Sequence, residues 1–203
     1  MAQRVYGVVS QKGGVGKSAI AQGIAVHHAL AGKRVLLADL DPGQETSLAW
    51  YGDRSEKIPL LDVKKFRNVQ DVSKIANDYQ VIVFDGAAHA SEETLAIAEV
   101  SDRLFIPSGS SMADMRPAAR LAHELLRKGI EQKTLRIVLM KIASVAEGKA
   151  ALEAFHEQNL KTLGHLRFSL GYQQAQDAGK APQEAVHPGL RKHAQEFIHL
   201  LTK

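Results

Sequence analysis

A glycine-rich segment near the start of the chain has the residue types and spacing of a phosphate-binding loop. Residues 11–19 read QKGGVGKSA, and the glycines let backbone N–H groups approach an anion with no Cβ in the way. Lysine and serine at the end of such a loop hold the β- and γ-phosphates and ligate Mg²⁺. We therefore predict that ATP and Mg²⁺ bind here, with Ser18 as a metal ligand and the nucleotide held by Lys12, Gly13, Gly14, Val15, Gly16, Lys17, Ser18 and Ala19.

The start of this loop departs from the strict pattern G-x-x-x-x-G-K-[ST]. That pattern would place its first glycine at residue 11, where the chain has Gln11, and a second lysine, Lys12, follows directly. The glycines and the lysine that would touch phosphate are all present. We interpret the loop as intact, with Lys12 as an added cation.

Aspartates follow two short apolar runs of the sequence. Residues 34–38 precede Asp39 and Asp41, and residues 81–84 precede Asp85. Chemistry in α/β folds gathers at the C-terminal ends of parallel strands, so these carboxylates should lie beside the glycine loop. Four apolar residues followed by Asp are typical of a Walker B strand, which predicts that Asp85 holds Mg²⁺ directly or through water.

Short apolar runs alternate with helical stretches along the chain. The runs lie at residues 4–9, 34–38, 81–84, 104–106 and 135–140, and the clearest helical stretches at 18–31, 114–128 and 149–158. This alternation predicts an α/β fold, doubly wound, with a mostly parallel sheet and helices on both faces. No Pro/Gly linker or repeat divides the sequence, so we expect residues 1–203 to form a single domain.

The composition limits the classes of protein to which the chain can belong. The chain has no cysteine, which excludes disulfides and thiolate metal sites and fits a cytoplasmic location. No apolar run reaches the roughly 18 residues of a membrane span, so no transmembrane segment is expected. With 26 basic and 22 acidic residues the net charge is +4, which permits a polyanionic partner without requiring one.

Three segments resemble those of a known family. The loop KGGVGKS resembles the deviant Walker A loop of the ParA/MinD family of P-loop ATPases, and the segments DLDPGQETSLAW and VIVFDGA resemble those that follow it there. The D-G-A form looks like that of small plasmid partition ATPases of the ParF type. The resemblance covers most of the chain, is strongest over residues 4–116 and weaker over residues 166–182, and implies Mg²⁺-dependent hydrolysis of ATP to ADP and phosphate.

The resemblance also implies roles for individual residues. Lys12 would reach the partner's nucleotide in an ATP-bound homodimer, beside the catalytic Lys17 of that subunit. Asp41 would orient the attacking water, and Asp39 would support the Mg²⁺ shell. Gly43 is an extra residue in the D-x-D-P-Q segment, which leaves the role of Gln44 open. Asp114 either matches an aspartate of the family or simply caps a helix.

For partners, the resemblance implies a ParA-type cycle. The ATP dimer would bind nonspecific DNA, and a ParB-like or other adaptor would stimulate hydrolysis, driving plasmid or chromosome partition on the nucleoid. The basic residues offered for DNA contact are Arg167, Lys180, Arg191 and Lys192. One alternative is a MinD-like, membrane-associated or cargo-positioning ATPase, and another is an ATP-dependent biosynthetic enzyme. The apolar stripe of residues 190–203 fits a membrane-binding helix, but we favour a helix docked on the core.

Overall fold

A seven-stranded parallel sheet forms the centre of the structure. The computed structural model describes residues 3–41, 43–88 and 92–203, and its strands lie in the order β3-β2-β4-β1-β5-β6-β7 with every neighbouring pair parallel. The doubly wound parallel fold predicted from the sequence is confirmed. The strands are β1 (Arg4–Val8), β2 (Val35–Asp39), β3 (Leu61–Lys65), β4 (Val81–Asp85), β5 (Arg103–Ser108), β6 (Leu135–Ile142) and β7 (Thr162–Arg167).

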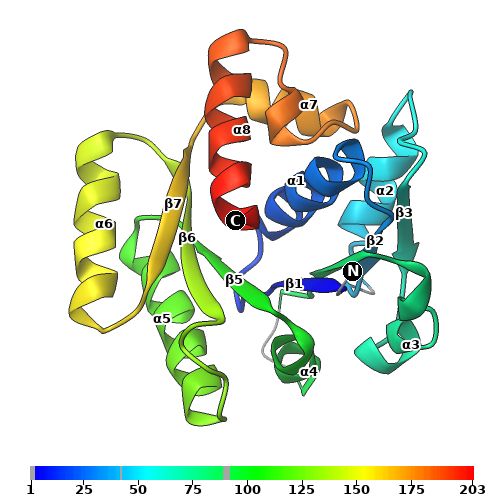
Figure 1. The fold of residues 1–203 in the computed structure, drawn as a ribbon. Helices are drawn as coiled ribbons and strands as arrows, with labels where there is room; N and C mark the ends of the chain where they lie inside the picture. Colours follow the sequence, from blue (N-terminus) through cyan, green and yellow to red (C-terminus); the bar gives the residue numbers. More distant parts are fainter. Residues whose placement is uncertain (1–2, 42, 89–91) are drawn as a thin grey trace.

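Helices cover both faces of the sheet (Figure 1). Each face has its own apolar core, because successive side chains of a strand point to opposite sides: Leu36 belongs to one core and Leu37 to the other. One face packs against α1 (Lys17–Leu30), α2 (Thr46–Asp53), α7 (Leu170–Asp177) and α8 (Pro188–Thr202). The other packs against α3 (Val69–Ser73), α4 (Glu92–Val100), α5 (Met112–Arg127) and α6 (Val145–Glu157).

The C-terminal helix α8 docks on the core. Ala194, Phe197, Ile198 and Leu201 are buried in the cluster that also contains the apolar side chains of α1. The packing predicted for this amphipathic stretch is therefore confirmed. Among the residues that the structure describes, no helix combines the length and apolarity that crossing a membrane would require.

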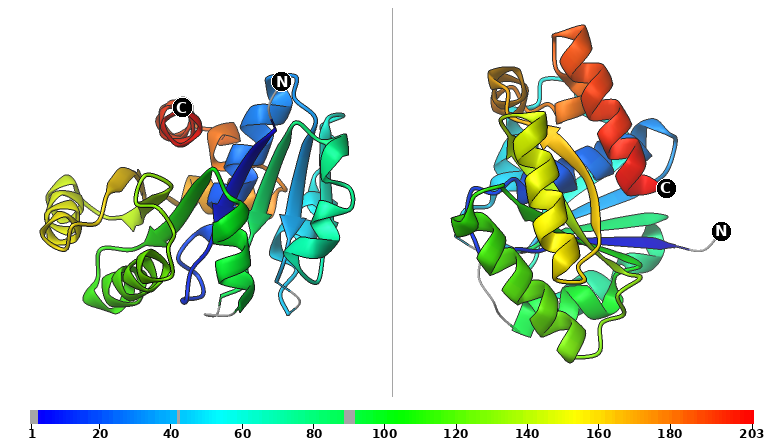
Figure 2. Two further views of the ribbon diagram at one scale, coloured as in Figure 1. Left: turned by 60° about the horizontal axis from the view of Figure 1, so that its bottom comes forward. Right: turned by 90° about the vertical axis from the view of Figure 1, so that its left-hand side faces the viewer.

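The strand ends that carry the predicted site residues are in register. Asp85 at the end of β4 lies beside Asp39 of β2 on one side and beside Val8 of β1 on the other. Neighbouring strands are about 4.8 Å apart, so the two carboxylates and the start of the glycine loop share one short stretch of the sheet end. The loops after β1 and β2 both leave the sheet at this end (Figure 2, left).

Candidate functional site

The glycine loop joins β1 to α1 in a conformation that two of its glycines make possible. Gly14 has φ 73° and Gly16 has φ 98°, values in the left-handed region that side chains disfavour. A Cβ on Gly16 would also lie 2.9 Å from Cε of Met140. Gly16 is the N-cap of α1 and Lys17 its first residue, so the positive end of the helix dipole points at the loop. The local geometry is that of an anion-binding loop.

Asp85 lies at the end of β4 with a carboxylate that is only partly satisfied. Its Oδ2 accepts a hydrogen bond of 2.7 Å from the Ser47 hydroxyl, whereas Oδ1 is buried and has no hydrogen-bond partner among the described residues. Burial raises the pKa of Asp85 to about 6, against the opposing effects of Ser47, Ser18 and Lys17. A buried, unpartnered carboxylate oxygen beside a serine hydroxyl suits a hard cation such as Mg²⁺.

Asp39 is fully buried, and its carboxylate binds the first turn of α2. Its Oδ2 accepts the backbone N–H groups of Ser47 at 2.9 Å and Leu48 at 3.1 Å, and its Oδ1 accepts that of Asp41 at 3.1 Å. Burial raises the pKa of Asp39, while these three N–H groups act to lower it. Ser47 contacts the carboxylates of both Asp39 and Asp85, so any support that Asp39 gives to Mg²⁺ would pass through Ser47. The sequence did not point to this serine.

Asp41 shapes the loop between β2 and α2. Its Oδ1 accepts the backbone N–H groups of Gly43 at 3.0 Å and Gln44 at 3.1 Å, an Asx turn that places the extra glycine next to the carboxylate. Pro42 of the same segment lies outside the described residues. Asp41 and Gln44 both line the cavity described next, so the longer loop still delivers the aspartate to the site.

A cavity of about 220 Å³ connects the loop to the C-terminal part of the chain. Its polar side consists of the glycine loop and strand ends, namely Gly14, Gly16, Lys17, Ser18, Ala19, Asp41, Gln44, Thr46, Asp85 and Gly86. Its other side is mixed: an apolar wall of Met140, Leu166, Phe168, Tyr172 and Pro182 is interleaved with Lys141, Arg167, Ser169, Gln173 and Gln176. A phosphate-binding floor with an apolar wall suits a nucleotide, whose base is flat and apolar on its faces.

The apolar wall was only partly foreseen. The sequence marked residues 166–182 as a family-like segment without assigning Phe168 or Tyr172 to the nucleotide, because pairing a distant segment with the loop requires the fold. Lys141 could have been singled out, since it stands at the end of a predicted strand. Within the described residues no three His, Asp or Glu side chains form a metal-binding group, so a metal would need ligands from the nucleotide as well.

Lys12 does not line this cavity and pairs with its own chain. Its ammonium forms an ion pair with Asp114 and lies 3.4 Å from the carbonyl oxygen of Ala113. Burial alone would raise the pKa of Asp114, but hydrogen bonds from Lys12 and Ser111 and nearby positive charge hold it below its usual value. Helix α5 begins at Met112 after an N-cap at Ser111, so the hypothesis that Asp114 is the N-cap is wrong.

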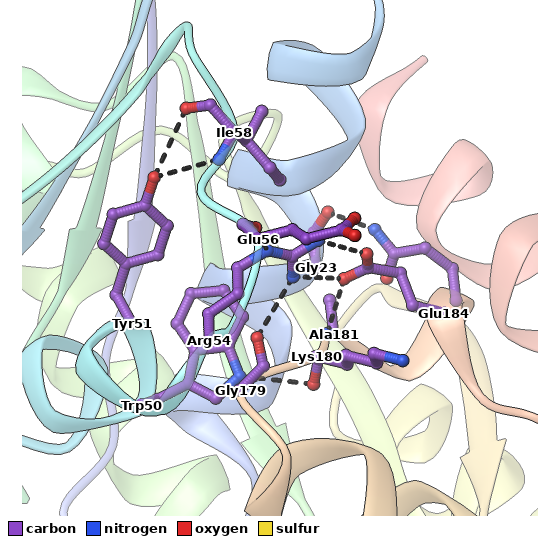
Figure 3. Close-up of polar contacts among 11 residues, drawn as sticks. Gly23, Trp50, Tyr51, Arg54, Glu56, Ile58, Gly179, Lys180, Ala181 and Glu184 are labelled. Atoms are coloured by element: carbon purple, nitrogen blue, oxygen red, sulfur yellow. Dashed lines mark hydrogen bonds and ion pairs between the residues drawn. The ribbon is translucent and has the colours of Figure 1, made fainter.

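The C-terminal end of α2 is clamped to the segment that carries the cavity wall (Figure 3). Arg54 pairs with both carboxylate oxygens of Glu184, at 2.8 and 2.5 Å, and donates to the Gly179 carbonyl at 3.0 Å. The buried Trp50 donates from Nε1 to the Lys180 carbonyl at 3.2 Å. Trp50 is thus structural, and it fixes α2 against residues 179–184.

The four basic residues predicted for DNA contact differ in their surroundings. Arg167 lines the cavity beside the glycine loop, which favours a role in that cavity. Lys180 lies in a groove with Val186, whose carbonyl accepts a 3.0 Å hydrogen bond from Arg191. Lys192 is exposed on α8. Lys180, Arg191 and Lys192 thus lie around the start of α8, and Arg167 is close enough to this helix for its charge to lower the pKa of His193.

Sequence comparison gives one family match. Residues 6–182 match the family described as the CobQ/CobB/MinD/ParA nucleotide binding domain. The comparison with curated proteins gives no match.

Solved structures share the fold at low sequence identity. The apo McdA protein of Cyanothece is 15% identical with a TM-score of 0.77, covering 99% of this chain and 100% of its own. The MinD cell division protein of Aquifex aeolicus is 18% identical, with a TM-score of 0.75 and coverage of 98% and 97%. A putative plasmid partition protein of Borrelia burgdorferi, bound to AMPPNP, is 16% identical, with a TM-score of 0.72 and coverage of 100% and 99%. At these identities the likeness establishes the fold.

Proposed function

The chain belongs to the CobQ/CobB/MinD/ParA nucleotide-binding family, and from this membership we propose that it is a ParA-type ATPase. One observation carries the proposal: the buried, unpartnered Oδ1 of Asp85 lies at the strand end next to the loop that carries Lys17 and Ser18. A bound Mg²⁺ would neutralise charge on the β- and γ-phosphates. Ser18 and Asp85 would hold it, and Lys17 would bind the phosphates.

Hydrolysis would depend on two further residues. Asp41 lines the cavity and would orient the water that attacks the γ-phosphoryl group, giving ADP and phosphate. Lys12 would leave Asp114 and reach the nucleotide of a second copy of the chain, so that two subunits enclose two ATP molecules. A cation supplied in this way stabilises the transferred phosphoryl group and makes dimerisation depend on ATP.

We further propose that the ATP-bound dimer binds nonspecific DNA in the cytoplasm, on the nucleoid. Lys180 and Lys192 near the start of α8 supply phosphate contacts, with Arg191 partly engaged by the chain itself. Two copies of this surface on one dimer would add their contacts along the duplex. Hydrolysis stimulated by a ParB-like or other adaptor would release the DNA, and repeated cycles would partition a plasmid or chromosome. Residues 1–203 would act as one domain.

The test is Mg²⁺-dependent ATP hydrolysis by the purified chain. The proposal expects phosphate release with Mg²⁺, none with EDTA, and loss of both binding and hydrolysis in Lys17→Ala. Lys133→Ala, an exposed lysine on the opposite end of the sheet from the loop, serves as the control and should match the wild type. Hydrolysis that survives in Lys17→Ala would contradict the proposal.

A further inference from the structure

Lys141 adopts a backbone conformation that lysine disfavours. Its φ is 59°, in the left-handed region. Met140 pairs with Leu166 and Ile142 with Arg167, so Lys141 is an extra residue of β6 opposite a continuous β7, that is, a β-bulge. Bulges redirect a side chain and occur beside functional sites, and a left-handed non-glycine residue persists only where its surroundings enforce it.

The redirected side chain reaches the glycine loop. Nζ of Lys141 donates a 2.7 Å hydrogen bond to the carbonyl oxygen of Gly14. In a trans peptide the C=O and the following N–H point in opposite directions, so fixing the Gly14 carbonyl also fixes the N–H of Val15. Lys141 thereby sets the plane of one peptide in a loop that works through the directions of its N–H groups.

Lys141 also lies between two cavities. It lines the nucleotide cavity together with Gly14 and Met140, and the same three residues line a neighbouring cavity of about 430 Å³ that contains Lys12, Asp114 and Glu147. The charge of Lys141 contributes to the low pKa of Asp114, which locates the ammonium within electrostatic reach of the Lys12 pair. The lysine therefore adds positive charge where the phosphate end of the nucleotide cavity meets the Lys12 pocket.

We propose that Lys141 is a positioning residue for the nucleotide, which holds the Gly14 peptide of the loop in its phosphate-binding orientation and adds a positive charge to that end of the cavity. The proposal rests on the nucleotide-binding function proposed above. It explains why a lysine occupies a position that glycine or asparagine would fill with less strain: the side chain contributes to binding, at a cost in backbone energy.

The test compares three substitutions that separate charge from backbone strain. Lys141→Asn and Lys141→Gly accept the left-handed conformation but lack the ammonium, whereas Lys141→Arg keeps a cation. Two quantities are measured: the Kd for ATP with Mg²⁺, by calorimetry, and the Tm of the nucleotide-free protein. Lys149→Asn, an exposed lysine of α6, is the control.

We expect the Kd for ATP to rise about ten-fold in Lys141→Asn and Lys141→Gly, as for loss of a charged hydrogen bond, and to stay within about three-fold in Lys141→Arg. The Tm of Lys141→Asn and Lys141→Gly should equal or exceed that of the wild type, since both residues adopt the left-handed backbone conformation with less strain than lysine. A wild-type Kd in Lys141→Asn would overturn the proposal, and so would a lowered Tm with an unchanged Kd. If the wild type itself binds no ATP, and Lys17→Ala behaves identically, the proposed function fails instead.

Discussion

The ammonium of Lys12 pairs with the carboxylate of Asp114 from the same chain. The lysine belongs to the glycine loop and the aspartate to the first turn of α5, 102 residues later. In the proposed dimer Lys12 would instead reach the nucleotide of the partner subunit. The two contacts use the same ammonium, so the pair within one chain competes with assembly.

Replacing Asp114 with asparagine should therefore favour the dimer. A partly exposed ion pair contributes up to about 1 kcal/mol, and forming the dimer would break one such pair in each subunit, so Asp114→Asn should tighten the ATP-dependent dimerisation constant up to about thirty-fold. Analytical ultracentrifugation with ATP measures it. Glu124→Gln removes an exposed ion pair with Lys128 of the same helix region and serves as the control. Weaker dimerisation in Asp114→Asn would show that the aspartate supports assembly rather than opposing it.

Removing Lys12 should separate nucleotide binding from assembly. The lysine does not line the proposed nucleotide cavity of its own chain, so Lys12→Ala should bind ATP within about three-fold of the wild type, a loss of less than about 1 kcal/mol. The dimer and its hydrolysis should be lost. Calorimetry gives the first quantity and size-exclusion chromatography with ATP the second. Normal turnover in this variant would exclude a role for Lys12 in trans.

Asp41 should be needed for hydrolysis but not for binding. Asp41→Ala should lower the rate of phosphate release by roughly a hundred-fold or more and leave an ATP-bound dimer that persists. Asp41→Asn retains an acceptor for the N–H groups of Gly43 and Gln44, which separates loss of the carboxylate from collapse of the loop. Hydrolysis at the wild-type rate in both variants would refute the role.

Asp85 makes the free energy of unfolding of the nucleotide-free protein depend on pH. Its pKa of about 6 in the folded chain exceeds the ordinary value of 3.8, so the folded state binds the proton more tightly. The resulting stabilisation is complete below pH 3.8 and is lost as the pH rises through 6. Asp85→Asn abolishes the charge, and at pH 7 it should stabilise the nucleotide-free protein by about 3 kcal/mol.

Urea unfolding between pH 4 and 8 measures this difference, which should shrink toward zero near pH 4. The same variant should lose the stabilisation that Mg²⁺ and ATP give the wild type, because the cation loses its carboxylate ligand. If Asp85→Asn is the less stable protein at pH 7 without nucleotide, the buried carboxylate is not a source of strain.

The buried strands and the glycine loop were predictable because their signals are local. Strands β2 and β4 are buried on both faces and read as continuous apolar runs. Strands β3 and β7 lie at the sheet edges and were not predicted; their half-exposed sequences LDVKK and TLGHLR lack such a run. Helix α2, held by Asp39 and Trp50, is also set by tertiary contacts rather than by its own sequence pattern.

The residues of the site also fall into those with a local sequence signal and those that only the fold brings together. Lys17, Ser18, Asp41 and Asp85 were found from motif and strand end, and all four line one cavity. The apolar wall, the Ser47 bridge and the bulge at Lys141 depend on segments more than 20 residues apart, which no local pattern joins. Lys12 shows what a sequence pattern leaves out: the sequence identifies it as an extra cation, but only the fold places Asp114 opposite it.

The most direct test of the proposed function is binding to nonspecific duplex DNA with ATP, with ADP and without nucleotide, over a salt series. We predict that the chain binds DNA with ATP but not with ADP or without nucleotide, and that this binding weakens steeply as salt rises and is reduced in Lys180→Ala and Lys192→Ala. ATP dimers that bind no DNA at any salt concentration would contradict the DNA-partition proposal and direct the search to membranes or protein scaffolds.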